Sequence, residues 1–265
     1  MTVTAKGLPD GLKVDKTSGV ISGKPKAAGS FKATVTVKTA AGNTIKFKVK
    51  IVARDGVQLW ENGPYWATTN IGADNPWDYG LYFWWGDTKG YSPSSDGKFS
   101  FNFDIDNDAI YTHGKYPSEM RKEGWLAYIA NASPLTPEHD AAHVQWGEQW
   151  RMPTESELSY LGSSEYCDRK WTEVNGVYGC IVSGKGDYAS ASIFLPATGR
   201  GDGTSLGSAG KYGWYWSSET DGYPMDGEFG SWALYFKQES KKTVFGRTSD
   251  PYRELGLAIR PVKAK

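Results

Sequence analysis

The sequence predicts a mostly β protein with two short helices, divided into two domains. The chain of 265 residues holds 32 glycines, and 14% of its residues are aromatic, a combination typical of many short strands joined by tight turns. Apolar and polar residues alternate through two neighbouring segments near the N-terminus, which indicates half-buried strands. Two later segments instead carry the capping signals of helices.

The domain boundary is indicated by a change of charge between Arg54 and Asp55. Residues 1–54 hold eleven basic and two acidic residues, a net charge of +9, whereas residues 55–265 hold 19 basic and 28 acidic residues, a net charge of −9. We therefore predict one domain over 1–54 and a larger one over 55–265. The lysines of the first domain alternate along its strands, as expected of a solvated sheet face that discourages edge pairing. No arginine cluster or stacking aromatic residue accompanies them, so nucleic acid is not predicted as a partner.

The first domain is predicted to contain two long strands, residues 29–38 and 44–53, joined by a turn at 40–43. Phe31 and Phe47 fall on the apolar face of these strands, opposite the lysines. Upstream, the chain reads GLPDGL and then TSGVISGKP, which resembles the putative-Ig module of bacterial surface proteins. The resemblance implies an Ig-like β-sandwich that acts as a spacer in secreted or surface-anchored proteins. The matching positions are Gly7, Leu8, Pro9, Gly11, Leu12, Ser18, Gly19, Ile21, Ser22, Gly23 and Pro25.

Both predicted helices lie in the middle of the second domain. The Thr-Pro pair at 136–137 provides an N-cap followed by a proline in the first turn, and Gly147 ends this helix. Thr154 and Glu157 form a capping box at the start of the second helix, which Gly162 ends. A surface insertion over residues 89–135 is predicted to precede the helices.

The remaining elements of the second domain are predicted to be strands. Asn175 and Gly176 have the preferred residue types for the two-residue turn of a hairpin, in which Cys180 opposes Trp171. Four aromatic or β-branched segments within residues 213–262 indicate an antiparallel sheet. The other predicted strands are residues 65–67, 81–85 and 192–199.

Three motifs of the second domain carry a second resemblance. They read WRMPT at 150–154, FLPA at 194–197 and YWSS at 215–218. Together they resemble the Fibrobacter succinogenes major paralogous domain over about 59–262, with 89–135 matching least. The resemblance implies a C-type-lectin-like α+β fold, with two helices on two small antiparallel sheets, of a kind common in Bacteroidetes surface proteins.

Enzyme chemistry is not predicted. The formylglycine-generating enzymes related to this fold need reactive cysteines, and Cys167 and Cys180 stand at other positions. These two cysteines form either a disulfide or two free buried thiols. His139 and His143 have helical spacing that suits zinc, but no third ligand accompanies them, so a helix surface is favoured.

No cofactor or metal is predicted to be required. Asp104, Asp106 and Asp108 leave a structural calcium site open as an alternative, although Ala109 and Lys115 exclude an EF-hand loop. The EPN and WND motifs of calcium-dependent sugar binding are absent from the sequence. The Arg-Gly-Asp tripeptide at 200–202 is interpreted as a chance match rather than an integrin-binding motif.

The predicted binding site lies on the connections 219–229 and 247–253, which carry tyrosines, acidic residues and arginines on expected loops. Tyr223, Tyr252 and Arg253 are the strongest single candidates, since each stands beside a proline or in a short turn. The alternative is that members of the set pack into the domain, above all Met225 and Phe229. The full set is Glu219, Asp221, Tyr223, Met225, Asp226, Glu228, Phe229, Arg247, Asp250, Tyr252 and Arg253.

We therefore predict a non-enzymatic cell-surface or secreted binding protein, an adhesin whose head recognises a protein or glycan of a host or bacterial surface. The alternative is a structural or tip subunit of a pilus-like surface assembly. The sequence contains no run of 18 apolar residues, so no membrane-spanning helix is predicted. The expected location is extracytoplasmic. The sequence indicates no oligomeric state.

Overall fold

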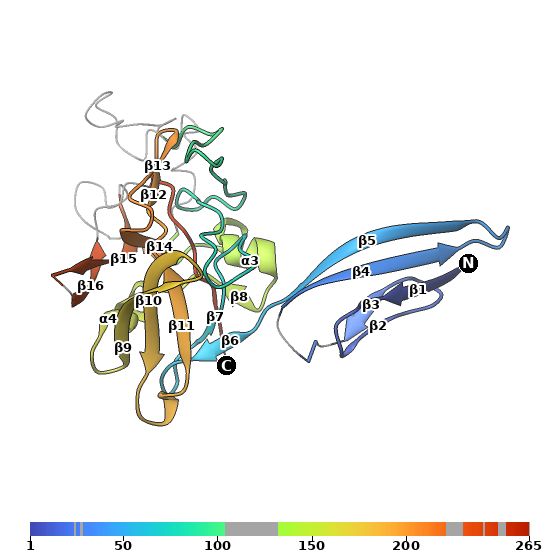
Figure 1. The fold of residues 1–265 in the computed structure, drawn as a ribbon, viewed down its shortest axis with the longest axis horizontal. Coiled ribbons are helices and arrows are strands. Elements are labelled where there is room, and N and C mark those ends of the chain that lie inside the picture. The colour runs from blue at the N-terminus through green and yellow to red at the C-terminus, as the bar shows by residue number, and fades with distance from the viewer. Residues whose placement is uncertain are drawn as a thin grey trace. The chain divides into compact units, whose positions relative to one another are not determined.

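The computed structural model describes residues 1–23, 25–26, 29–103, 132–220, 230–240, 242–248 and 253–264. These residues belong to two compact units, Met1–Asp55 and Gly56–Lys265, which we call the module and the head (Figure 1). The described residues form mostly antiparallel sheets with two α-helices, which confirms the predicted fold class. The boundary predicted from the sequence, after Arg54, lies one residue earlier than the boundary between these units.

The module contains a three-stranded sheet and a short hairpin. The two long strands have the bounds that the sequence predicts, and the turn between them contains Gly42 at a φ of 85°. Val35 pairs with Phe47, so both lie on one face of the sheet. The hairpin is tied to the first strand because the Val3 amide donates to the Lys16 carbonyl at 2.8 Å. The strand order is β1 (Thr2–Lys6), β4 (Gly29–Lys38), β5 (Thr44–Ala53), and the hairpin pairs β2 (Leu12–Val14) with β3 (Ile21–Gly23).

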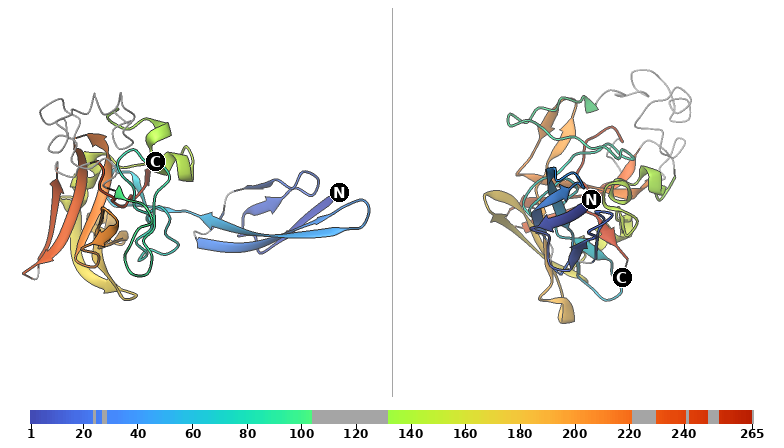
Figure 2. Two further views of the ribbon diagram at one scale, coloured as in Figure 1. Left: turned by 90° about the horizontal axis from the view of Figure 1, so that it is seen from above. Right: turned by 90° about the vertical axis from the view of Figure 1, so that its right-hand side faces the viewer.

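The described residues of the head form four antiparallel sheets, of which one joins segments from both ends of the unit. In that sheet Val262 pairs with both Trp66 and Arg151. The sheet order is β6 (Gly56–Gln58), β7 (Tyr65–Ala67), β17 (Val262–Lys263) and β8 (Trp150–Arg151). The others are β11 (Ser192–Pro196) with β10 (Val177–Gly184) and β9 (Cys167–Val174), β12 (Arg200–Asp202) with β13 (Ser205–Gly207), and β14 (Tyr212–Thr220) with β15 (Ser231–Glu239) and β16 (Lys242–Thr248). Figure 2 shows β14, β15 and β16 side by side as the orange to red strands.

The first predicted helix is divided in the structure. A 3₁₀ turn, η3 (Pro137–His139), ends at Asp140, and the helix α3 (Ala141–Trp146) begins there. Thr136 makes no capping hydrogen bond, whereas the Asp140 carboxylate accepts from the amides of Ala142 and His143. The single helix predicted from Thr136 was therefore wrong, because the better cap lies four residues later.

The second predicted helix is confirmed as α4 (Glu155–Gly162), with both hydrogen bonds of the Thr154–Glu157 capping box present. Gly162 is its last residue. In the described part of the chain, no helix is long and apolar enough to cross a membrane.

The hairpin of β9 and β10 follows the prediction. Asn175 and Gly176 have φ values of 50° and 81°, as a type I′ turn requires, and Cys180 pairs with Trp171. Cys167 lies opposite Gly184, four positions further along. Both cysteines are buried and free, so the alternative of a disulfide between them is wrong in this structure.

Two predicted strands form isolated bridges instead of continuous ladders. Within residues 81–85, Phe83 pairs with Leu257, and their backbone groups exchange hydrogen bonds of 3.0 and 2.9 Å. The segment 256–262 likewise contributes single bridges before β17 begins at Val262. Both segments are buried at the centre of the head, where their side chains, rather than a ladder, fix their position.

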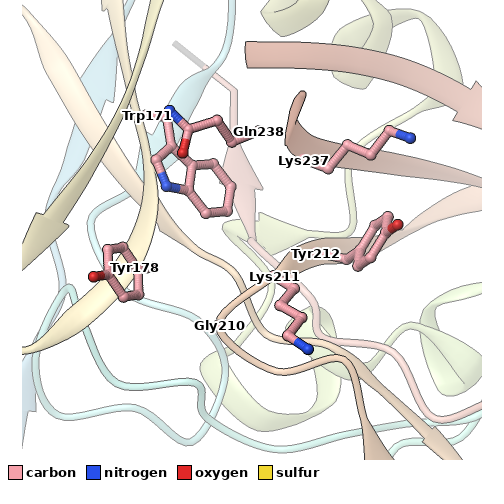
Figure 3. A pocket seen from close by; sticks show the side chains of 7 residues that line it. All are labelled: Trp171, Tyr178, Gly210, Lys211, Tyr212, Lys237 and Gln238. Carbon is pink, nitrogen blue, oxygen red and sulfur yellow. The ribbon is translucent and has the colours of Figure 1, made fainter. Parts of the chain in front are cut away.

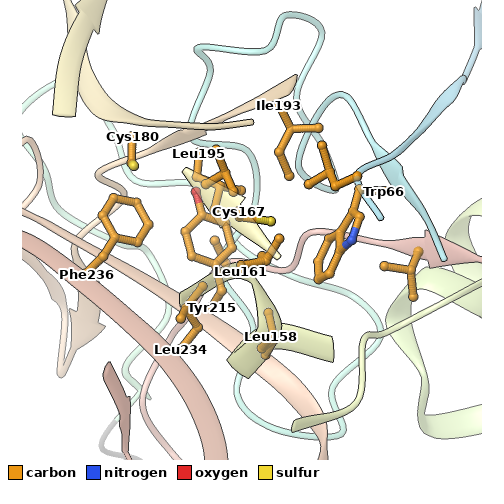
Figure 4. Close-up of a cluster of buried hydrophobic side chains, with 14 of the residues drawn as sticks. Trp66, Leu158, Leu161, Cys167, Cys180, Ile193, Leu195, Tyr215, Leu234 and Phe236 are labelled. Carbon is orange, nitrogen blue, oxygen red and sulfur yellow. The ribbon is translucent and has the colours of Figure 1, made fainter. Parts of the chain in front are cut away.

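Aromatic side chains contribute to every cluster of the head core. One cluster surrounds Trp66, Tyr215 and Phe236 between α4 and the two three-stranded sheets (Figure 4). A second cluster contains Trp85 and Trp216. Most of the aromatic content noted in the sequence therefore serves packing, and the aromatic side chains that remain exposed are the informative ones.

Candidate functional site

A groove of about 430 Å³ lies beside the β9–β10 hairpin of the head (Figure 3). Its volume falls within the roughly 300–1,000 Å³ range of small-molecule sites. Its walls come from three places in the sequence: the hairpin, the turn that leads into β14, and the end of β15. The lining residues are Trp171, Tyr178, Gly210, Lys211, Tyr212, Lys237 and Gln238.

Trp171 and Tyr178 form one wall of this groove. Their ring centroids lie 6.4 Å apart and their planes differ by only 15°, so the rings present nearly parallel faces. Trp171 is half-buried because it packs edge-on against Phe236 in the core, at 6.2 Å. Its backbone amide donates to the Thr243 hydroxyl at 3.0 Å, which links β9 to β16. This support leaves Tyr178, at 48% exposure, as the open part of a fixed aromatic surface.

Lysine side chains and a tyrosine form the opposite wall. Lys237 pairs with Tyr212 across β14 and β15, and its ammonium lies 5.8 Å from the tyrosine ring centroid. The same ammonium lies 3.5 Å from Oε2 of Glu239, so its position is set by two contacts. Lys211 and Gln238 are exposed at the rim. The groove therefore combines aromatic faces with amide and ammonium donors.

A second hollow, of about 350 Å³, adjoins α3 and the start of α4. Two of its charged groups, Arg151 and Asp140, are already engaged within the fold. Arg151 donates to both carboxylate oxygens of Glu157, at 2.8 and 2.6 Å. The buried Asp140 carboxylate accepts from three backbone amides, those of Ala142, His143 and Met152. These bonds make the hollow a poorer candidate than the aromatic groove.

Most of the site residues predicted from the sequence lie outside the described residues: Asp221, Tyr223, Met225, Asp226, Glu228, Phe229, Asp250 and Tyr252. Arg247 belongs to β16, where its backbone pairs with Leu234. Glu219 is half-buried, and its Oε2 accepts from the Glu155 amide at 2.7 Å. Glu219 therefore serves the N-terminus of α4, where a carboxylate is favoured by the helix dipole.

Arg253 requires a correction, because the sequence placed it on an exposed turn and it is fully buried. Its guanidinium carbon lies 4.3 Å from the centroid of the Trp85 ring, and its carbonyl accepts from the Trp85 amide at 2.9 Å. Residues 254–260, which follow directly, are buried as well. Arg253 thus supports the core through its contact with the Trp85 ring.

The structure describes the residues of two further alternatives, the His139–His143 pair and the Arg-Gly-Asp tripeptide. His139 lies in η3 and His143 in α3, so the two do not share one continuous helix, and Nδ1 of His139 lies 3.3 Å from the Gly86 carbonyl oxygen. Among the described residues, no group of three potential metal ligands occurs. The aspartates at 104–108 lie outside the described residues. The Arg-Gly-Asp tripeptide forms β12, where Arg200 and Asp202 pair with each other at 3.3 Å.

The aromatic groove was not predicted, although part of its signal was available in the sequence. Once Asn175 and Gly176 define the turn, the hairpin register places Trp171 and Tyr178 on one face, in a diagonal arrangement. The lysines of the opposite wall arrive from the β14–β15 ladder, at a distance from the hairpin that no local pattern encodes.

Comparison with known proteins identifies one part of the chain. Residues 1–53 match a family model described as Putative Ig domain, which supports the predicted Ig-like module. No curated protein and no solved structure matches the chain. An Ig-like module suggests a surface or adhesin-like protein, and such modules are typically non-enzymatic.

Proposed function

We propose that this chain is a non-enzymatic binding protein of the cell surface or a secreted adhesin, in which an Ig-like module carries a C-type-lectin-like head that binds a glycan. The observation that carries this proposal is the fixed aromatic wall of Trp171 and Tyr178 beside the donors of Lys211, Lys237 and Gln238. The apolar face of a sugar ring packs on aromatic rings, while its hydroxyls accept from amide and ammonium groups. Small-molecule sites typically combine aromatic and apolar walls with a few polar groups in this way.

The connections 219–229 and 247–253 remain part of the proposal as a second contact region for a protein or glycan. Tyr223 and Tyr252 are still their strongest candidates on sequence grounds. Arg253 is instead assigned to positioning, because its guanidinium packs on the buried Trp85 ring.

A glycan array probed with the full chain tests the proposal, followed by calorimetry on the best ligand. We expect Trp171→Ala and Tyr178→Ala each to cost about 2 kcal/mol of binding free energy, roughly thirtyfold in Kd. Tyr160→Ala is the matched control, because Tyr160 is 39% exposed and packs on Trp60, away from the groove. Unchanged affinity in both folded groove variants moves the site to the two connections, where Tyr223→Ala and Tyr252→Ala are the next variants.

One observation favours a second candidate function, a structural or tip subunit of a pilus-like surface assembly. The edge strand β5 of the module exposes the apolar side chains of Ile45 and Phe47, each at 51%. An assembly subunit is expected to form a defined oligomer or polymer at micromolar concentration, with an element other than β5 of the neighbouring copy covering Ile45 and Phe47. Sedimentation velocity on the full chain measures this directly.

A further inference from the structure

We propose that the outer edge of β5 accepts an extended strand from a partner protein, and that this strand alternates apolar with acidic residues. The proposal concerns the module alone, so it stands whether or not the head binds a glycan. It rests on three features of the module: an open edge, an apolar face that continues to that edge, and lysines on the other face.

The open edge is a matter of strand order. In the described part of the module the order is β1–β4–β5, and β5 pairs with β4 at all ten of its positions. The opposite backbone edge of β5 thus has no strand beside it among the described residues. Such an edge presents amide and carbonyl groups over about 33 Å, which is a template for an added strand.

The apolar face of the sheet is covered near β1 and exposed near β5. The β2–β3 hairpin packs beside β1, where Val3 is only 2% exposed, and Ala33 of β4 is 1% exposed. Figure 1 shows this hairpin beside β1, with β5 at the far edge. Ile45 and Phe47, on the same face as Val3, are each 51% exposed. An added strand with apolar residues at alternate positions would cover both.

The lysines of β5 indicate which residues the partner strand carries between its apolar ones. Lys46 and Lys48 are exposed on the opposite face of β5, and their cross-strand neighbours in β4 are Thr36 and Thr34. Residues 1–54 contain eleven basic residues and only two acidic ones. Charge complementarity therefore favours glutamate or aspartate at the positions of the added strand that flank these lysines.

A second copy of β5 does not fit this edge. Successive side chains of a strand alternate between the two faces. With the exception of Val52, the apolar residues of β5 occupy odd positions, and its lysines occupy even ones. Any pairing of two β5 strands that continues the apolar face therefore places lysines beside lysines, in parallel and antiparallel arrangements alike. Like charges in these positions are unfavourable, so the edge selects a partner of opposite charge.

The test uses the full chain and synthetic ten-residue peptides with blocked ends. The probe peptide alternates valine and glutamate. One control replaces every glutamate with lysine, and another has the same composition as the probe with its valines and glutamates in separate blocks. We expect fluorescence anisotropy to give a Kd for the probe about tenfold or more below that of either control. The difference should shrink as salt is added. Equal binding of the three peptides, or binding of none, would overturn the proposal.

Two further measurements separate strand addition from simple charge attraction. Backbone N-methylation at alternate residues blocks the hydrogen bonds of one peptide edge, so only one of the two possible methylated probes should lose binding. Loss of binding by neither would overturn the proposal. In the charge-reversed protein, Lys46→Glu with Lys48→Glu, the preference should pass to the lysine peptide. A chain that self-associates without peptide through β5, and stops doing so in Phe47→Ser, would identify a second copy as the occupant and would also overturn it.

Discussion

The module and the head contain the same kind of alternating strand, but they bury its apolar face to different degrees. Among the described residues of the module, Val3 and Ala33 are 2% and 1% exposed, whereas Ile45 and Phe47 on the same face are each 51% exposed. The alternating pattern predicts which side of a strand is apolar. It does not predict whether another layer covers that side.

In the head, three clusters of buried side chains cover the apolar faces of the strands from several directions. This difference in exposed apolar surface indicates where each unit binds a ligand. Exposed apolar surface in the module lies on a backbone edge, which suits another strand. In the head, the exposed Tyr178 lies in a groove with polar donors, which suits a small polar ligand. The stability of the chain should accordingly depend on the head.

The largest expected effect is at Arg260, which is fully buried in the head. Its guanidinium donates to Oδ1 of Asn70 at 2.8 Å and to the carbonyls of Ala67 and Phe194 at 3.1 and 3.0 Å, and burial lowers its pKa to about 10. Arg260→Met leaves three buried acceptors without these donors. We expect a loss of about 3–5 kcal/mol in the free energy of unfolding, measured with urea.

The control for Arg260→Met is Arg169→Met, because Arg169 is partly exposed and donates one hydrogen bond, to the Cys167 carbonyl. We expect this variant to lose about 1 kcal/mol or less. Equal losses of unfolding free energy in the two variants would contradict this expectation, since the buried Arg260 network would then contribute no more than a partly exposed contact. If Arg260→Met does not fold, the milder Arg260→Lys allows the same measurement.

Local patterns predicted the fold best where the partners are close in sequence. The bounds of β4 and β5, the Asn175-Gly176 turn and the Thr154 capping box all depend on residues within about ten positions of each other. Apart from the first helix, whose cap lies four residues later than predicted, the errors concern distant partners. Phe83 pairs with Leu257, and Arg260 bonds to residues near position 70, so no short window of sequence contains both halves of these contacts.

The candidate site shows the same division. One wall of the groove follows from the register of a single hairpin, which brings Trp171 and Tyr178 to one face. The other wall needs the packing of β14 and β15 beside that hairpin, which is a tertiary fact. Arg253 was misplaced for a related reason, since a charged residue after a proline favours a surface turn unless a buried aromatic ring such as Trp85 receives it.

A smaller effect on the free energy of unfolding is expected at Asp140, which caps α3. Its carboxylate accepts from two amides of the helix and from the Met152 amide, the last at 2.8 Å. We expect Asp140→Ala to lose about 2–3 kcal/mol in the free energy of unfolding. Because Asp140 lies in the head, any unfolding transition of the module should be unchanged. A shifted midpoint of the module transition in Asp140→Ala would contradict this expectation, because it would show that the two units unfold as a coupled pair.

The pH dependence sharpens the prediction for Asp140. Burial raises the pKa of its carboxyl, although the three amide hydrogen bonds oppose this shift. A carboxyl with a raised pKa in the folded state binds a proton more readily there than in the unfolded chain. Its contribution to stability therefore decreases as the pH rises from about 3.9 through the folded pKa. The stability difference between wild type and Asp140→Ala should narrow over that window, and a widening difference would mean that the amide bonds outweigh burial.

The smallest effect is expected from removing the module altogether. Residues 55–265 contain all three clusters of buried side chains that stabilise the head, and residues 1–54 contribute to none of them. The truncated head should therefore unfold cooperatively with the midpoint of the head transition in the full chain. Residues 1–55 alone should unfold over a broad range, because a small unit with so few buried side chains is marginally stable. Calorimetry on the two fragments and the full chain measures both expectations. A head that is insoluble or melts without cooperativity, or a module that melts as sharply as the head, would reverse the assignment of stability to the head.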